Sequence, residues 1–211
     1  MANAVETPER SSGERWPALV IMVGAPGSGK SYLARMLGAA LGAVLIQTDV
    51  VRKELYPDPQ YTAAEHTAVY AACHQRIREA LARGERVVFD ATNLRERRRR
   101  TLYQMAERAD AIVEIVVAYA SDAVIRERLR GRAEGVDPED RSDADLGVYL
   151  RMRRDTEPVP RPHVVVNTSA APGPAIRLLE RQLSERPAGP VERPAQRGEG
   201  RRREPRAKPH A

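Results

Sequence analysis

The sequence predicts one α/β domain, a three-layer α/β/α sandwich with a central parallel sheet and a small helical lid. Two observations predict it. Short apolar runs alternate with segments of helical periodicity between residues 17 and 184, and a glycine-rich loop joins the first run to the first helical segment. Strands that alternate with helices form parallel sheets covered on both faces. Ligands of such folds gather at the carboxyl ends of the strands.

Each predicted strand is a short apolar run. The strands cover residues 18–23, 43–46, 86–90, 112–119 and 163–166. Helices are predicted over roughly residues 62–84, 94–109, 122–132, 143–154 and 174–183. A further helix follows the glycine loop, because apolar residues recur there at helical spacing, namely Leu33, Met36, Leu37, Ala40 and Leu41.

The glycine-rich loop fits the phosphate-binding pattern G-x-x-x-x-G-K-[ST] at every fixed position, and it lies between a strand and a helix as that P-loop motif requires. Its glycines let backbone N–H groups turn inward around an anion, and the helix N-terminus adds partial positive charge. We therefore expect the loop to bind a nucleoside triphosphate, ATP. The residues expected to contact it here are Gly24, Ala25, Pro26, Gly27, Ser28, Gly29, Lys30, Ser31 and Tyr32.

Three side chains near this loop are expected to act on the triphosphate and on Mg²⁺. Lys30 should reach the β- and γ-phosphates, and the Ser31 hydroxyl should be a ligand of Mg²⁺. Asp90 ends an apolar strand, which is the usual position in a P-loop protein for an acid that holds Mg²⁺ directly or through water. Ser31 and Asp90 are therefore the predicted metal pair.

Polar residues after the second and third strands suggest a site for a phosphoryl acceptor. Asp49 and Arg52 are three positions apart, so they point the same way if a helix begins there. Asp49 acts either as general base for a substrate hydroxyl or as the cap of that helix. Arg52 is expected to hold the acceptor or its phosphate. Thr92 and Asn93 either contact the acceptor or cap the next helix.

Arginines fall on the apolar arcs of two predicted helices, where arginine is rare unless it is paired or contacts a ligand. After the third strand, Arg98 reaches either the acceptor or a buried carboxylate, while the run of residues 97–100 is mostly solvated. After the fourth strand, Arg128 and Arg132 precede a loop rich in Gly, Asp and Pro. We interpret them as lid arginines that neutralise the transferring phosphoryl group; pairing with a core carboxylate is the alternative.

The positive charge of the chain is concentrated at its C-terminus. The 211 residues carry a net charge of +6, and residues 185–211 alone contribute +4, with eight Arg or Lys, four Glu and five Pro. We predict a disordered basic tail there, a domain at 17–184 with a lid at about 128–145, and a flexible segment at 1–16. The tail either contacts nucleic acid loosely or has no function of its own.

Other compositional features exclude several classes of protein. The single cysteine makes a disulfide framework or a structural zinc site implausible. The polar N-terminus contains neither a signal sequence nor a membrane span, so a cytoplasmic protein is expected. Hydrophobic residues make up 42% of the chain, enough for one domain with a core.

Four segments, in this order and spacing, resemble the polynucleotide-kinase-like P-loop kinases over about residues 17–170. They are Gly24–Ser31, Thr48–Arg52, Asp90–Leu94 and Arg128–Arg132. The chain is also similar, more distantly, to chloramphenicol phosphotransferase and the zeta-toxin sugar-nucleotide kinases. The resemblance implies that Asp49 is the general base, that Arg52 contacts the acceptor and that Arg132 contacts the nucleotide phosphates. It also implies a nucleotide base lying between the lid and the loop before the last helix.

The predicted function is transfer of the ATP γ-phosphoryl group to a hydroxyl, with Lys30, Asp49, Arg52 and Arg132 as catalytic residues. The acceptor stays open between a nucleic-acid 5′ end and a small molecule such as a sugar, nucleoside or antibiotic. A tunnel for a single strand usually offers stacking aromatics. Aromatics make up only 4% of this chain, with Trp16 outside the predicted domain.

Three tyrosines flank the predicted acceptor region, namely Tyr56, Tyr61 and Tyr70. His66 and His74 receive no role. The second function class is a nucleotide-dependent switch or interaction module, in which the P-loop binds ATP and the basic tail binds a partner. The sequence contains no Asn-Lys-x-Asp segment for reading guanine, which argues against a GTPase.

Overall fold

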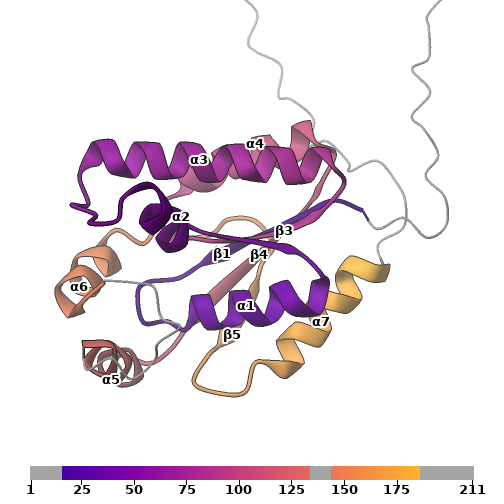
Figure 1. Ribbon diagram of the computed structural model, residues 1–211. Coiled ribbons are helices and arrows are strands. Elements are labelled where there is room, and N and C mark those ends of the chain that lie inside the picture. The colour runs from indigo at the N-terminus through magenta and orange to yellow at the C-terminus, as the bar shows by residue number, and fades with distance from the viewer. Residues whose placement is uncertain (1–15, 134–143, 186–211) are drawn as a thin grey trace, which may run out of the picture.

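A parallel sheet forms the centre of the computed structural model, which describes residues 16–133 and 144–185. Within these ranges the sheet has five strands in the order β2-β3-β1-β4-β5 (Figure 1). The strands are β1 (Ala18–Val23), β2 (Val44–Gln47), β3 (Arg86–Asp90), β4 (Ile112–Tyr119) and β5 (Val164–Asn167). Three strands have the predicted bounds, and β2 and β5 are each shifted by one residue.

Helices cover both faces of this sheet (Figure 1). On one face lie α1 (Lys30–Leu41) and α7 (Gly173–Glu185), and on the other lie α3 (Ala63–Ala82) and α4 (Glu96–Arg108). The helices α2 (Thr48–Leu55), α5 (Asp122–Ala133) and α6 (Leu146–Arg154) lie near the end of the sheet that carries the P-loop. The predicted three-layer α/β/α sandwich is confirmed.

Two hydrophobic clusters fill the spaces between these layers. Under α3 and α4, Val69, Cys73 and Leu102 pack with sheet residues such as Phe89. Under α1 and α7, Leu33, Leu37 and Leu179 pack with the opposite faces of the same strands. Because residues alternate sides along a strand, each central strand contributes to both clusters, and the sheet is buried on both faces.

The sequence prediction misplaced two residues relative to the core. Ala40 was assigned to the inward face of α1 but is exposed, whereas Ala34 and Gly38 are buried. Trp16 was placed outside the domain, but it is partly buried and packs against the cluster under α1 and α7. Its indole adds apolar area at the first described residue, where periodicity gives no signal.

Parts of several predicted segments lie outside the described residues. They include residues 1–15, most of the loop after α5 (134–143) and the basic tail (186–211). Within the described part of the chain, no helix is both long enough and apolar enough to span a membrane.

Strand register brings the polar residues of the site to one edge of the sheet. Gln47 at the end of β2 is paired with Asp90 at the end of β3, and Ile21 of β1 is paired with Phe89. The P-loop leaves β1 at the same edge, because all of these strands are parallel.

Candidate phosphate-binding and acceptor site

The P-loop adopts a conformation that only glycine accommodates easily. Gly27 and Gly29 have φ angles of 78° and 77°, in the left-handed region, and Gly29 is the N-cap of α1. A Cβ atom on Gly29 would lie 2.8 Å from Thr168 Oγ1, so space is lacking there as well. The Gly24 amide donates to the Thr92 carbonyl at 3.1 Å, which fixes the loop to the turn after β3.

Two side chains from distant parts of the chain hold the carbonyl oxygens of this loop. Arg128 Nη1 donates to Gly27 O at 3.3 Å and to Thr168 Oγ1 at 2.9 Å, and its Nη2 donates to Thr168 O at 2.7 Å. The Thr168 hydroxyl in turn donates to Ser28 O at 2.6 Å. These bonds occupy carbonyl oxygens, so they leave the loop's N–H groups available for an anion.

Arg128 therefore contacts the P-loop itself and is half-buried, without a carboxylate partner among the described residues. The sequence prediction did not include Thr168. Its position directly after the last strand, at the edge where ligands gather, was the available signal.

Lys30 and Asp90 form an ion pair at the centre of the site. The side chains of Lys30 and Asp90 are 11% and 3% exposed, and Gln47 Nε2 donates to Asp90 Oδ2 at 2.9 Å. Burial of the Asp90 carboxyl raises its pKa, but the Lys30 ammonium and the hydrogen bonds from Lys30, Gln47 and Ser31 outweigh this, and the pKa lies below its ordinary value. Asp90 is therefore ionised at neutral pH.

The oxygen atoms beside this pair suit a magnesium ion. The Lys30 ammonium lies 3.4 Å from the Ser31 hydroxyl and contacts Asp90, so the predicted metal pair lies around one lysine. Magnesium in nucleotide sites takes one or two protein oxygens together with phosphate oxygens and water, which these donors allow. Among the described residues, no group of three or more His, Cys, Asp or Glu gathers as a metal site.

The second predicted pair lies on α2, which begins directly after β2. Its N-cap is Gln47, so Asp49 lies in the first turn and is not the cap. Asp49 is half-buried, and Arg52 is only 3% exposed. The sequence thus places a carboxylate and an almost fully buried guanidinium next to the end of β3.

Residues of α3 surround the Arg52 guanidinium. Its Nη1 lies 3.6 Å from Glu65 Oε2, its Nη2 lies 3.3 Å from His66 Nδ1, and its Cζ lies 4.7 Å from the centre of the Tyr61 ring. Two of its nitrogen atoms, Nε and Nη1, are buried without a hydrogen-bond partner. Buried donors are normally satisfied, so these atoms indicate room for a ligand acceptor.

Along α3, His66 and Tyr70 face the same side, and Arg98 of α4 meets them. The ring centres of His66 and Tyr70 are 6.2 Å apart, and Arg98 Cζ lies 4.2 Å from the centre of the Tyr70 ring. Burial, then Arg52 and Arg98, lower the pKa of His66 below its ordinary value. Asp49 acts in the opposite direction on the same histidine. These contacts define the α2–α3–α4 cluster, comprising Asp49, Arg52, His66, Tyr70 and Arg98.

The sequence gave no role to His66, which contacts Arg52. Its spacing of four residues from Tyr70 and eight from His74 placed all three on one helix face, and this was the missed signal. Of the two alternatives for Arg98, contact with a buried carboxylate is not seen among the described residues, and the side chain lies over Tyr70.

The turn after β3 differs from its prediction. Asn93 neither caps α4 nor faces the cluster: it is fully buried with a φ of 46°, and its Nδ2 donates to Met22 O at 2.8 Å. The N-cap of α4 is Arg95, two residues later than predicted. Arg99, within the run expected to be mostly solvated, is completely buried.

The remaining predicted residues lie at the rim of the site. Arg132 Nη1 donates to Ala144 O at 2.9 Å, so it contacts the residue at which the described chain resumes. Tyr32 is 54% exposed at the start of α1. The predicted roles of Arg132 and Tyr32 in nucleotide binding remain predictions.

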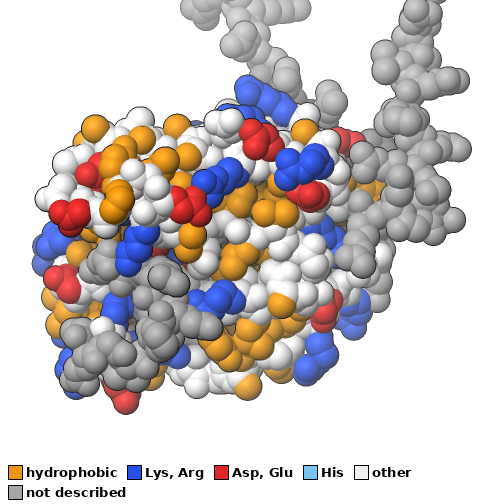
Figure 2. Space-filling model, viewed as in Figure 1, with side chains coloured by type: hydrophobic (Ala, Val, Ile, Leu, Met, Phe, Trp, Pro, Cys, Tyr) orange, Lys and Arg blue, Asp and Glu red, His pale blue; other side chains and the backbone are white. Residues whose placement is uncertain are grey.

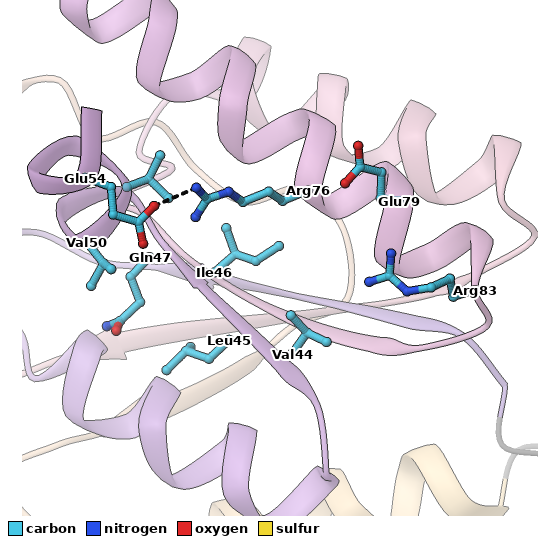
Figure 3. Close-up of a pocket in the computed structure, with 10 residues that line it drawn as sticks. Val44, Leu45, Ile46, Gln47, Val50, Glu54, Arg76, Glu79 and Arg83 are labelled. Carbon is cyan, nitrogen blue, oxygen red and sulfur yellow. Dashed lines mark hydrogen bonds and ion pairs between the residues drawn. The ribbon is translucent and has the colours of Figure 1, made fainter. Parts of the chain in front are cut away.

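A separate hollow of about 260 Å³ lies along the free edge of β2 (Figure 3). Val44 and Ile46 form its floor, and the ion pair between Arg76 and Glu54, at 2.6 Å, crosses it. Basic and acidic side chains are intermixed on this face of the molecule (Figure 2), so it offers no field of one sign for a nucleic acid. Charged side chains beside an edge strand discourage addition of a further strand.

The glycine loop, its lysine and the parallel sheet together define a P-loop domain of the α/β class. Residues 19–159 match the family described as the AAA domain, and the chain belongs to that family. No curated protein sequence matches the chain significantly.

Solved structures of several kinases share this fold. The structure of Kti12 from Chaetomium thermophilum in complex with ADP-AlF3 has a TM-score of 0.65 at 21% identity, over 81% of this chain and 100% of that one. A gluconokinase from Sinorhizobium meliloti 1021 has a TM-score of 0.57 at 22% identity, over 81% and 94% of the two chains. The APS kinase CysC of Mycobacterium tuberculosis, with AMPPNP and APS, has a TM-score of 0.58 at 15% identity, over 82% and 99%.

Proposed function

We propose that this protein is an ATP-dependent phosphotransferase that moves the γ-phosphoryl group to a hydroxyl, on either a nucleic-acid 5′ end or a small molecule. One observation carries the proposal: the Lys30–Asp90 pair of the P-loop lies at the same sheet edge as a carboxylate and a buried arginine on α2. The solved structures of two kinases that share the fold, a gluconokinase and an APS kinase, support the same class.

The two sides of the site divide the chemistry between them. On the nucleotide side, the loop N–H groups and Lys30 bind the phosphates, and Lys30 leaves Asp90 as it turns to them. Ser31 and Asp90 would then hold Mg²⁺, which neutralises charge on the phosphoryl oxygens when bound. Arg132 is proposed to contact the same phosphates from the lid.

On the acceptor side, Asp49 orients the acceptor hydroxyl and accepts its proton during transfer. General-base action of this kind contributes roughly 10²–10⁴-fold to a rate. Arg52 holds the acceptor next to Asp49, with its unpartnered Nε and Nη1 as donors. This acceptor side favours a kinase over an ATP-dependent switch, because a switch has no use for a base beside a second ligand. A basic tail that binds nucleic acid remains part of the alternative.

The test is transfer from γ-labelled ATP with Mg²⁺ to a 5′-hydroxyl oligonucleotide and to sugars and nucleosides. Asp49→Asn is expected to retain ATP binding and to lose transfer by about 10²-fold or more, because the amide cannot accept the proton. Lys30→Ala should weaken both. Asp110→Asn, an exposed aspartate with a φ of 50° that asparagine tolerates, is the matched control and should behave as wild type.

Two outcomes would count against this proposal. Equal loss of ATP binding in Asp49→Asn and Lys30→Ala would refute the base assignment. ATP hydrolysis without transfer to any of these acceptors would favour the switch.

A further inference from the structure

We propose that the acceptor carries an oxyanion group, a phosphate or a carboxylate, which is bound between Arg98 and Arg52 on the α2–α3–α4 cluster. The proposal rests on the phosphotransferase function proposed above. It adds the chemical class of the acceptor and a specificity role for Arg98.

Arg98 stands apart from the other arginines at the start of α4 because no carboxylate balances its charge. Arg95 pairs with Asp155 at 2.8 Å, and Glu96 pairs with both Arg99 and Arg100. No carboxylate of the described residues lies within ion-pair distance of Arg98, although its side chain is half-buried. An arginine in this state lacks a counter-charge and has donors to spare.

The position of Arg98 leaves these donors usable. Its guanidinium lies 4.2 Å from the centre of the Tyr70 ring, a cation–π contact that fixes the side chain and uses no N–H group. Tyr70 is itself held edge-on against Phe89 of β3, at a ring distance of 6.4 Å. A planar guanidinium held in this way can donate two parallel hydrogen bonds to an oxyanion.

Arg52 faces the same two rings from the other end. It contacts His66, whose ring is next to that of Tyr70, and it has the two unpartnered nitrogen atoms described above. Both guanidiniums act on the His66 imidazole, which places both close to it.

The charges around the cluster sum in favour of an anion. Lys30 is balanced by Asp90, and Arg52 is partly balanced by Glu65 at 3.6 Å. Asp49 is reserved for the accepting hydroxyl in the proposed reaction. The excess positive charge therefore lies at Arg98, and an acceptor without an acidic group would leave it there uncompensated.

Matched acceptors test the class. In each of two pairs, gluconate with glucitol and a nucleoside 3′-phosphate with its nucleoside, the acidic member should have a kcat/KM at least tenfold higher. Arg98→Gln should lower kcat/KM for the acidic members by about ten- to a hundredfold, through KM, and leave the neutral members and ATP binding unchanged. Arg97→Gln, one position away and exposed, is the control. Equal use of both members by wild type, or an equal loss for both in Arg98→Gln, would overturn the proposal.

A binding experiment separates this proposal from the proposed function. Sulfate is titrated into the MgADP-bound protein, and the imidazole resonances of His66 are followed by NMR. Sulfate should shift them and raise the pKa of His66 in wild type and Arg97→Gln, and bind at least tenfold more weakly in Arg98→Gln. Absence of a response in wild type would overturn the oxyanion site even if a neutral acceptor were phosphorylated. A response without transfer to any acceptor would support the site and count against the phosphotransferase.

Discussion

A single buried guanidinium, that of Arg99, organises the turn that follows β3. It is 0% exposed; its Nη1 donates to Asn93 O at 2.8 Å and to Leu94 O at 2.9 Å, and its Nη2 donates to Pro158 O at 2.6 Å. Its Nε pairs with Glu96 at 2.9 Å. One side chain therefore joins the start of α4 to the segment after α6, directly behind the strand end that carries Asp90.

Replacing Arg99 should cost more stability than any other arginine of this helix. Arg99→Met leaves several buried carbonyls without a donor, and an unsatisfied buried group costs roughly 1–3 kcal/mol. We expect a decrease of about 3–5 kcal/mol in the free energy of unfolding, measured by urea denaturation. The exposed neighbour provides the comparison, since Arg97→Met should change it by less than about 0.5 kcal/mol. A loss below about 1 kcal/mol for Arg99→Met would contradict this role.

The burial of Arg99 could not be predicted from periodicity, for two reasons. The helix begins at Glu96, two residues later than the apolar pattern suggested, and this shifts which arginine points inward. The carbonyls that satisfy Arg99 also come from residues 58 and 59 positions away, which no local pattern reveals. By contrast, Lys30, Ser31 and Asp90 were found because a motif and a strand end fix their positions.

At the scale of elements, two glycines separate a backbone requirement from a packing preference. Gly27 has a φ of 78°, and a Cβ there would lie 3.0 Å from Ile125 Cγ2 and 3.1 Å from Leu129 Cγ. Gly38 lies inside α1, where the nearest atom to an added Cβ is Leu45 Cβ at 3.6 Å, an ordinary contact.

The corresponding alanine variants should therefore differ in sign. Gly27→Ala should destabilise the protein by about 1–2 kcal/mol and weaken ATP binding, because the left-handed conformation is strained for alanine and α5 must shift. Gly38→Ala should stabilise it by about 0.5–1 kcal/mol, because alanine restricts the unfolded chain and favours helix. Thermal unfolding and nucleotide titration measure both. Loss of stability in Gly38→Ala, or a neutral Gly27→Ala, would show that the local geometry is misjudged.

Most elements could be predicted because their signals are local. The run Ala18–Val23 lies between Pro17 and Gly24, and Arg86–Asp90 follows Gly84, so both strands have the bounds that the sequence indicated. Thr62 and Glu65 mark the start of α3, where the Thr62 hydroxyl accepts from the Glu65 amide at 3.2 Å. The strand order was not predicted, because it depends on contacts between segments far apart in the chain.

For the whole molecule, three groups set how stability should depend on pH. The pKa values of His66 and His74 are lowered by burial and by nearby arginines, so their contribution is complete above about 6.5 and is lost as the pH falls through the lower folded-state values. Burial raises the pKa of Cys73 to about 11, so its contribution is complete below 9.0 and is lost as the pH rises towards 11.

We therefore expect the free energy of unfolding to be highest between about pH 7 and 9 and to fall on either side. Urea denaturation at pH 5, 8 and 10.5 measures this dependence. In the double variant His66→Gln and His74→Gln, the part of the decline that lies between pH 6.5 and 5 should become smaller. An increase in wild-type stability on acidification through this range would have the opposite sign and contradict the assignment.

The bonds from Arg128 and Thr168 to the P-loop also concern the order in which the protein becomes functional during synthesis. These two residues lie 101 and 140 positions beyond the loop carbonyls that they hold. The ribosome therefore completes the nucleotide motif long before it produces the groups that set the motif's shape. A nascent chain that ends before Thr168 contains every residue of the motif, yet it should bind ATP weakly, and nucleotide affinity should rise only when the last strand has emerged and docked.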